Sequence, residues 1–213
     1  MSIINRNEYD CPNCSHKLSI NVYDSINVGI NPELKDLVLA GKLNSAVCPE
    51  CDKRIVINQS FMYHDPKNLL IINHVPKHAD PYEVVESSKL FSLFAGYMLR
   101  YVTRLPELTE KIKLSDNNLN DIAVQLLKIN LFRNEDLNQN NSIKDIDFLL
   151  FEEDTLIFQV VFKDGSGQII SISHAAYLQI YESLVQLNLL DRDKDRCICV
   201  NDEYIMDLLK DYL

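Results

Sequence analysis

Hydrophobic and polar residues follow two different periods along this chain, and the two periods predict its elements. Alternation of apolar and polar residues predicts strands, whereas apolar residues three or four positions apart predict helices. In the first third, strands are predicted at 17–23, 54–58 and 69–73. The last two are expected to pair as a hairpin, because Tyr63-His64-Asp65-Pro66 between them has the composition of a turn.

A short helix is predicted between residues 31 and 41, because both of its ends carry typical helix signals. Asn31 is the expected N-cap, and Pro32 occupies the first helical position. Gly41 follows the last turn, where a helix commonly ends. The segment is therefore predicted to fold as one structured insertion between strands.

After residue 82 the pattern predicts helices that cover a small antiparallel sheet. The helices are predicted at 84–104, 115–132, 175–190 and 202–213, with Ser115 or Asp116 as the cap of the second. The strands are predicted at 147–152, 156–162, 168–173 and 196–200. The first three strands are expected to form a meander, since residues 163–167 read Lys-Asp-Gly-Ser-Gly, a hairpin turn signal.

Two copies of a C-P-x-C turn carry the most specific chemistry in the sequence: Cys11-Pro12-Asn13-Cys14 and Cys48-Pro49-Glu50-Cys51. Each turn directs two thiolates at one point, and two turns complete the tetrahedral Cys₄ shell of a structural zinc site. Such a closed shell leaves no position for a reactive water. Cys11, Cys14, Cys48 and Cys51 are therefore predicted to bind structural zinc, although a Cys₄ shell also suits iron.

A redox dithiol is the alternative role for a C-x-x-C pair. That role needs one pair at the start of a helix within a βαβ pattern, so two copies among strands argue against it. The 33 residues between the pairs exceed the spacing of a compact ribbon. The inserted helix at 31–41 accounts for the difference.

The two C-P-x-C motifs occur together with Asn31-Pro32-Glu33-Leu34-Lys35 and Tyr63-His64-Asp65-Pro66. In this combination the chain resembles the CpXC domain family of bacterial proteins, over about residues 10–72. Glu110-Lys111-Ile112 and the helical segment 119–128 also look like the C-terminal extension that often accompanies that domain. The resemblance implies that the four cysteines of the motifs are metal ligands. It implies no reaction.

The predicted fold class is α+β with two domains. Residues 1–76 are predicted to be a CpXC-like zinc ribbon with an inserted short helix. Residues 82–213 are predicted to be an acidic α+β domain with a small antiparallel sheet and about four helices. The boundary is expected between Pro76 and Pro81.

Charge is distributed unevenly, and this limits the expected partners. The 21 basic and 31 acidic residues give a net charge of -10, of which -9 lies in residues 76–213. A field of that sign repels phosphates, so a nucleic-acid partner is disfavoured. Because the N-terminus does not resemble a secretory signal and no apolar run is long enough to span a bilayer, we expect a cytoplasmic chain without a membrane partner.

Two other groups of residues resemble functional sites. His64-Asp65 resembles the start of general-base chemistry, but no nucleophile accompanies it and a turn explains Asp-Pro. Cys197 and Cys199 would need His174 and a further ligand to form a second metal site, whereas buried reduced thiols explain them more simply. No catalytic residue is predicted, and zinc is the one expected cofactor.

These observations favour a non-catalytic protein that acts by binding another protein, and the acidic charge suits a basic partner. A regulatory, immunity or defence component of a bacterial cell fits this description. The alternative is a nucleic-acid-binding zinc-ribbon module, by analogy with other ribbons. A further alternative is an enzyme of unknown class that uses His64 or His174.

Overall fold

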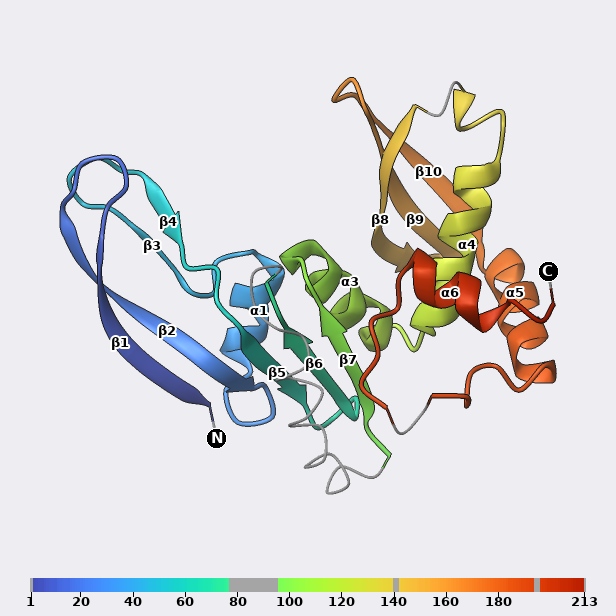
Figure 1. Cartoon of the computed structure of the whole chain (residues 1–213), viewed down its shortest axis with the longest axis horizontal. Helices are drawn as coiled ribbons and strands as arrows, with labels where there is room; N and C mark the ends of the chain where they lie inside the picture. Colours follow the sequence, from blue (N-terminus) through green and yellow to red (C-terminus); the bar gives the residue numbers. More distant parts are fainter. Residues whose placement is uncertain (1, 77–95, 140–141, 194–195, 213) are drawn as a thin grey trace. The chain divides into compact units, whose positions relative to one another are not determined.

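The computed structural model describes residues 2–76, 96–139, 142–193 and 196–212, and Figure 1 labels its elements. The chain is a mixed α+β protein that divides into two compact units. Unit 1 consists of Met1–Thr109 and Asp195–Cys197, and unit 2 of Glu110–Lys194 and Ile198–Leu213. The domain boundary predicted between Pro76 and Pro81 falls largely on residues 77–95, which lie outside the described residues.

Unit 1 is built on a five-stranded sheet with the order β1-β2-β5-β6-β7. These strands are β1 (Ile3–Asp10), β2 (Lys17–Asn27), β5 (Phe61–Asp65), β6 (Leu70–His74) and β7 (Met98–Val102). β2–β5 and β6–β7 are parallel pairs, and the other neighbours are antiparallel. Between β2 and β5 the chain forms α1 (Glu33–Leu39) and a separate hairpin of β3 (Ser45–Val47) and β4 (Arg54–Val56).

Strand pairing in unit 1 differs from the predicted hairpin of residues 54–58 with 69–73. β4 pairs with β3, and β6 pairs with β5, a strand that includes Tyr63, His64 and Asp65. The polar residues of β5 suggested a turn, but its buried positions alternate in the manner of a strand. The turn begins after Asp65, whose carboxylate accepts the backbone N–H groups of Lys67 and Asn68.

The helix predicted at 84–104 is wrong over its last part, because residues 98–102 form β7 beside β6. The earlier residues of that prediction, up to 95, lie outside the described residues. Leu99 and Val102 are three positions apart, a spacing that fits a helix, and both are buried in this strand. In so short a segment only the tertiary neighbour decides between the two readings.

The helix predicted at 31–41 is present as α1, with a different cap. Pro32 is the N-cap residue and has helical backbone angles, and its side chain has no acceptor atom, so it makes no capping hydrogen bond. The amide of Asn31 instead donates to Glu33 Oε1 and accepts the hydroxyl of Ser2. Gly41 follows the helix as predicted, at φ 62°, in the left-handed region that glycine adopts without strain.

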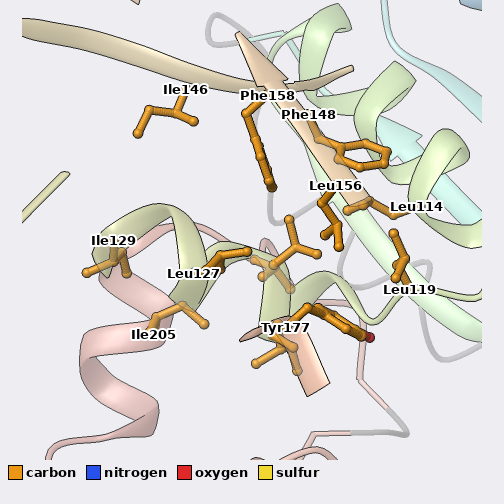
Figure 2. Close-up of a cluster of buried hydrophobic side chains, with 14 of the residues drawn as sticks. Leu114, Leu119, Leu127, Ile129, Ile146, Phe148, Leu156, Phe158, Tyr177 and Ile205 are labelled. Carbon is orange, nitrogen blue, oxygen red and sulfur yellow. The ribbon is translucent and has the colours of Figure 1, made fainter. Parts of the chain in front are cut away.

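Unit 2 contains the predicted meander, with β8 (Ile143–Glu152), β9 (Thr155–Phe162) and β10 (Gly167–Ser173) in the order β10-β9-β8. Its helices include α4 (Asp121–Arg133), α5 (His174–Gln186) and α6 (Asp202–Leu208). The core lies between this sheet and these helices. Figure 2 shows Leu156 and Phe158 of β9 directed towards the helices that carry Leu127 and Tyr177.

Two predictions in unit 2 need correction. The predicted helix 115–132 is the end of α3 (Leu105–Asp116) followed by α4, and Asn120 is the cap instead of Ser115 or Asp116. The Asn120 side chain accepts the N–H groups of Ile122 and Ala123, which closes the first turn of α4. Residues 196–200 form no strand beyond a single bridge at Ile198.

Acid is expected to destabilise unit 1 through His74. This imidazole is buried in β6 with its Nδ1 3.1 Å from the Gln59 carbonyl, and burial lowers its pKa below 6.5, although that hydrogen bond and Glu107 act in the opposite direction. Below about pH 6.5 the unfolded chain therefore binds more protons than the folded chain, so the free energy of unfolding falls as pH decreases.

Urea unfolding at pH 5 and pH 7.5 checks this expectation. The variant His74→Asn should lose part of the pH dependence, by at most about 1.4 kcal/mol per pH unit, because one titrating group is removed. An unchanged pH dependence in His74→Asn would assign the acid sensitivity to other groups.

Candidate metal centre

The two C-P-x-C turns have the same backbone structure. In each turn the first cysteine makes two backbone hydrogen bonds. Its carbonyl accepts the N–H of the residue four positions later, and its own N–H donates to the carbonyl of the residue five positions later. These distances are both 2.8 Å in the turn of Cys11 and both 2.9 Å in the turn of Cys48. Ser15 and Asp52 follow the second cysteines at φ 59° and 56°, in the left-handed region. The same sequence motif therefore folds into the same local turn twice.

Each turn closes an antiparallel hairpin. The turn with Cys11 and Cys14 joins β1 to β2, and the turn with Cys48 and Cys51 joins β3 to β4. Buried apolar side chains pack between the two hairpins, and this small cluster includes the first cysteine of each turn. Its buried members are Cys11, Leu18, Ile20, Val22, Cys48 and Ile55. The alternation of Leu18, Ile20 and Val22 thus holds the two turns against each other.

The structure brings the four predicted cysteines together. Their Sγ atoms all lie within 4.8 Å of one another. Sγ of Cys11 is 3.6 Å from that of Cys51, and Sγ of Cys14 is 3.6 Å from that of Cys48. Sulfurs bound at ~2.3 Å around a tetrahedral zinc ion are about 3.8 Å apart, whereas a disulfide needs about 2.05 Å. The arrangement fits a metal ion and does not fit disulfides.

Cys14 and Cys51 differ in pKa when no cation is bound. Hydrogen bonds from the Asn13 side chain and the Lys53 backbone lower the pKa of Cys51 to about 6. A backbone bond from His16 lowers the pKa of Cys14, but loss of hydration and the other three sulfurs together raise it to about 12. Four thiolates so close repel one another, so a divalent cation that neutralises them displaces the remaining protons. Asn13, inside the motif, is a contributor that the sequence reading did not identify.

His64 and Asp65 do not form a dyad. They are consecutive residues of β5, so their side chains leave opposite faces of the sheet. Asp65 is buried and accepts hydrogen bonds from Lys35 and Tyr63 in addition to the turn amides. His64 Nδ1 lies 3.1 Å from Asn27 Nδ2, and His64 Nε2 lies 3.2 Å from the hydroxyl oxygen of Tyr97. The carboxylate thus orders a turn and does not orient the imidazole.

The second metal site considered for Cys197 and Cys199 has no support. In the described ranges, the four cysteines of the two turns are the only group of three or more potential ligands close enough to share an ion. Cys197 is buried beside Ile71 and Leu99, and burial raises its pKa. His174 stacks on Tyr177 with the ring centroids 5.6 Å apart.

Comparison with known proteins identifies the region that contains these turns. The model of the CpXC protein family matches residues 9–128, more than half of the chain, and includes both cysteine turns and most of α4. No curated protein sequence and no solved structure matches the chain. Within the described residues, no helix has the length and apolarity needed to cross a bilayer.

Proposed function

The chain belongs to the CpXC family, and from that premise we propose that its four cysteines hold a structural zinc ion in a non-catalytic protein that binds another protein. The observation that carries the zinc proposal is the set of four sulfurs within 4.8 Å, two from each of two hairpin turns. Sulfur-only shells of this size are typical of structural zinc. The ion would tie the β1–β2 hairpin to the β3–β4 hairpin.

The closed shell also supports a non-catalytic role. Four cysteine ligands occupy all four coordination positions of a tetrahedral zinc ion, so no position remains for a water that the metal could activate. The candidate for a catalytic pair, His64 with Asp65, consists of side chains on opposite faces of a strand. Asp65 makes the structural contacts of a buried turn carboxylate.

The charge of unit 2 favours a basic protein partner. Its sequence contains 18 acidic and nine basic residues, a net charge of -9, whereas unit 1 has a net charge of -1. Within unit 2 a groove of about 280 Å³ lies beside α5, lined by Leu126, Ile180, Leu184, Leu187 and Leu209, together with two polar side chains. The charged residue of α5 is Glu182, and the helix has no Lys or Arg. An amphipathic basic helix suits an apolar groove on an acidic surface.

A designed helical peptide tests this partner class. The peptide carries leucines at i, i+3 and i+7 and lysines elsewhere, and it should bind the full chain more tightly at low than at high salt. Leu187→Asp should weaken binding about tenfold or more, because it places a charge in the groove. Val185→Asp is the matched control, since Val185 is exposed on α5 but does not line the groove.

Three results would contradict the partner proposal. These are equal effects of Leu187→Asp and Val185→Asp, equal binding of a peptide with glutamates in place of the lysines, and tight binding of DNA or RNA at low ionic strength. The last would favour the nucleic-acid alternative, because phosphate contacts are strongest at low salt.

A further inference from the structure

β1 is the edge strand of the five-stranded sheet, and the described structure covers little of it. Seven of its eight residues are exposed, and its neighbour in the sheet is β2. β2 in turn pairs with β5 only at Ser25–Asn27, so most of β1 belongs to a two-stranded ribbon. A ribbon of two strands is marginal in water, and its open edge offers backbone N–H and C=O groups to a third strand.

One face of β1 carries a positive residue, Arg6, followed by two negative residues, Glu8 and Asp10. Arg6 and Glu8 are two residues apart, so both side chains leave the same face of the strand. Arg6 donates to the Ser19 hydroxyl at 2.6 Å, and within the described ranges neither Arg6 nor Glu8 forms an ion pair. Charges on an edge normally repel unrelated strands. Opposite charges two residues apart, however, complement a second copy of the same strand.

Antiparallel hydrogen bonding restricts how two copies can pair. Every second residue of β1 directs its N–H and C=O towards β2, so only the remaining residues face the open edge. An identical strand offers the same alternate residues, and paired residues must therefore both be odd-numbered or both be even-numbered. The two-fold axis must pass through a residue and not between two residues.

The charges then select one register. An axis through Arg6 places two arginines opposite each other. An axis through Glu8 pairs Arg6 with Asp10 twice but places two glutamates opposite each other, so each of these registers contains a like-charge pair. An axis through Asn7 places Arg6 opposite Glu8 of the second copy, twice. The net charge of unit 1 is -1, so general repulsion at this surface is small.

We propose that β1 is a self-association surface, at which two copies of the chain pair antiparallel about Asn7 and extend the ribbon to four strands. The occupant of the open edge is thus a second copy of this chain. This surface lies on unit 1, and the proposal is independent of the partner proposed for unit 2.

Charge exchange tests the pairing. Sedimentation of the full, metal-loaded chain at about 50 mM salt should show a dimer that weakens as salt increases. Arg6→Glu and Glu8→Arg should each raise the dimer dissociation constant about tenfold or more, because both ion pairs become repulsive. The double variant Arg6→Glu/Glu8→Arg should restore the dimer. A mixture of the two single variants should also restore it, since their strands then carry opposite charges.

Cross-linking tests the register. In Asn7→Cys the two new thiols lie beside the axis, so mild oxidation with copper–phenanthroline, which accepts the two electrons, should form a disulfide dimer. In Asn5→Cys the corresponding residues are about 14 Å apart, beyond disulfide reach. The unsubstituted chain measures the background from its own cysteines.

Several results would overturn the proposal. A chain that stays monomeric at a few hundred micromolar has no such surface. A dimer that Arg6→Glu leaves unchanged uses another surface, and equal cross-linking of Asn5→Cys and Asn7→Cys excludes this register.

Discussion

Cys48→Ser is expected to release the metal and unfold the two cysteine turns while unit 2 keeps its structure. Cys48 has no exposed surface, and its sulfur lies 3.6 Å from that of Cys14. Loss of one thiolate opens the shell, and structural zinc contributes on the order of 10 kcal/mol to folding of the segment that binds it. The apolar cluster between the hairpins is small, with Leu18, Ile20, Val22 and Ile55 as its buried members besides the cysteines, so it is not expected to keep the hairpins folded without the metal.

In Cys48→Ser we expect only a part of the predicted ribbon, residues 1–76, to unfold. Tyr63, Leu70 and Ile72 are fully buried in β5 and β6, which gives this part of unit 1 apolar packing apart from the metal cluster. Limited proteolysis of the variant should therefore cleave first between residues 3 and 57. A chelator should produce the same pattern in the unsubstituted chain.

Cys197→Ser is the matched control, because Cys197 is also a buried thiol but does not belong to the four-sulfur group. This variant should keep the full metal content, measured by elemental analysis of the purified chain. A Cys48→Ser protein with full metal content and unchanged protease resistance would exclude a structural Cys₄ site. Zinc and iron are distinguished in the same measurement.

Lys111→Met is expected to lower the free energy of unfolding of unit 2 by about 3–5 kcal/mol. Lys111 Nζ of α3 lies 2.9 Å from Asp121 Oδ2 of α4, and both side chains are almost completely buried. Removal of the ammonium takes away the cation that lies 2.9 Å from the buried carboxylate, and loss of one partner is the costly change in such a pair. Urea unfolding followed by circular dichroism measures the change.

The double variant Lys111→Met/Asp121→Leu should recover most of this loss, because it removes both charges. Lys210→Met is the control, since the Lys210–Asp207 pair is exposed and should contribute less than about 1 kcal/mol. Equal losses in Lys111→Met and Lys210→Met would show that burial of the first pair does not determine its effect.

Local signals were sufficient for the elements whose pattern occurs within a few residues. The meander β8–β10 followed from alternation and a Gly-rich turn, and α5 and α6 followed from helical spacing. The C-P-x-C motif likewise specifies its own turn, since both copies form the same backbone hydrogen bonds.

Other elements could not be predicted because their pattern is ambiguous or absent. β1 has exposed residues on both faces and no apolar alternation to reveal it. β5 carries His64 and Asp65 among its buried residues and resembled a turn. Residues 98–102 fit a helix as well as a strand until β6 supplies a parallel partner.

The sequence by itself determined the four cysteines, their two turns and the uneven charge, because each of these depends on residue identity and short spacing. Only the tertiary structure decided that the four Sγ atoms of the two turns lie within 4.8 Å of one another. This proximity depends on packing between two hairpins that are about 37 residues apart in the chain. The tertiary structure also decided which strands pair, because hydrogen bonds between distant segments leave no periodic trace in either segment. The open edge of β1 is a property of this pairing, and no pattern within residues 3–10 contains it.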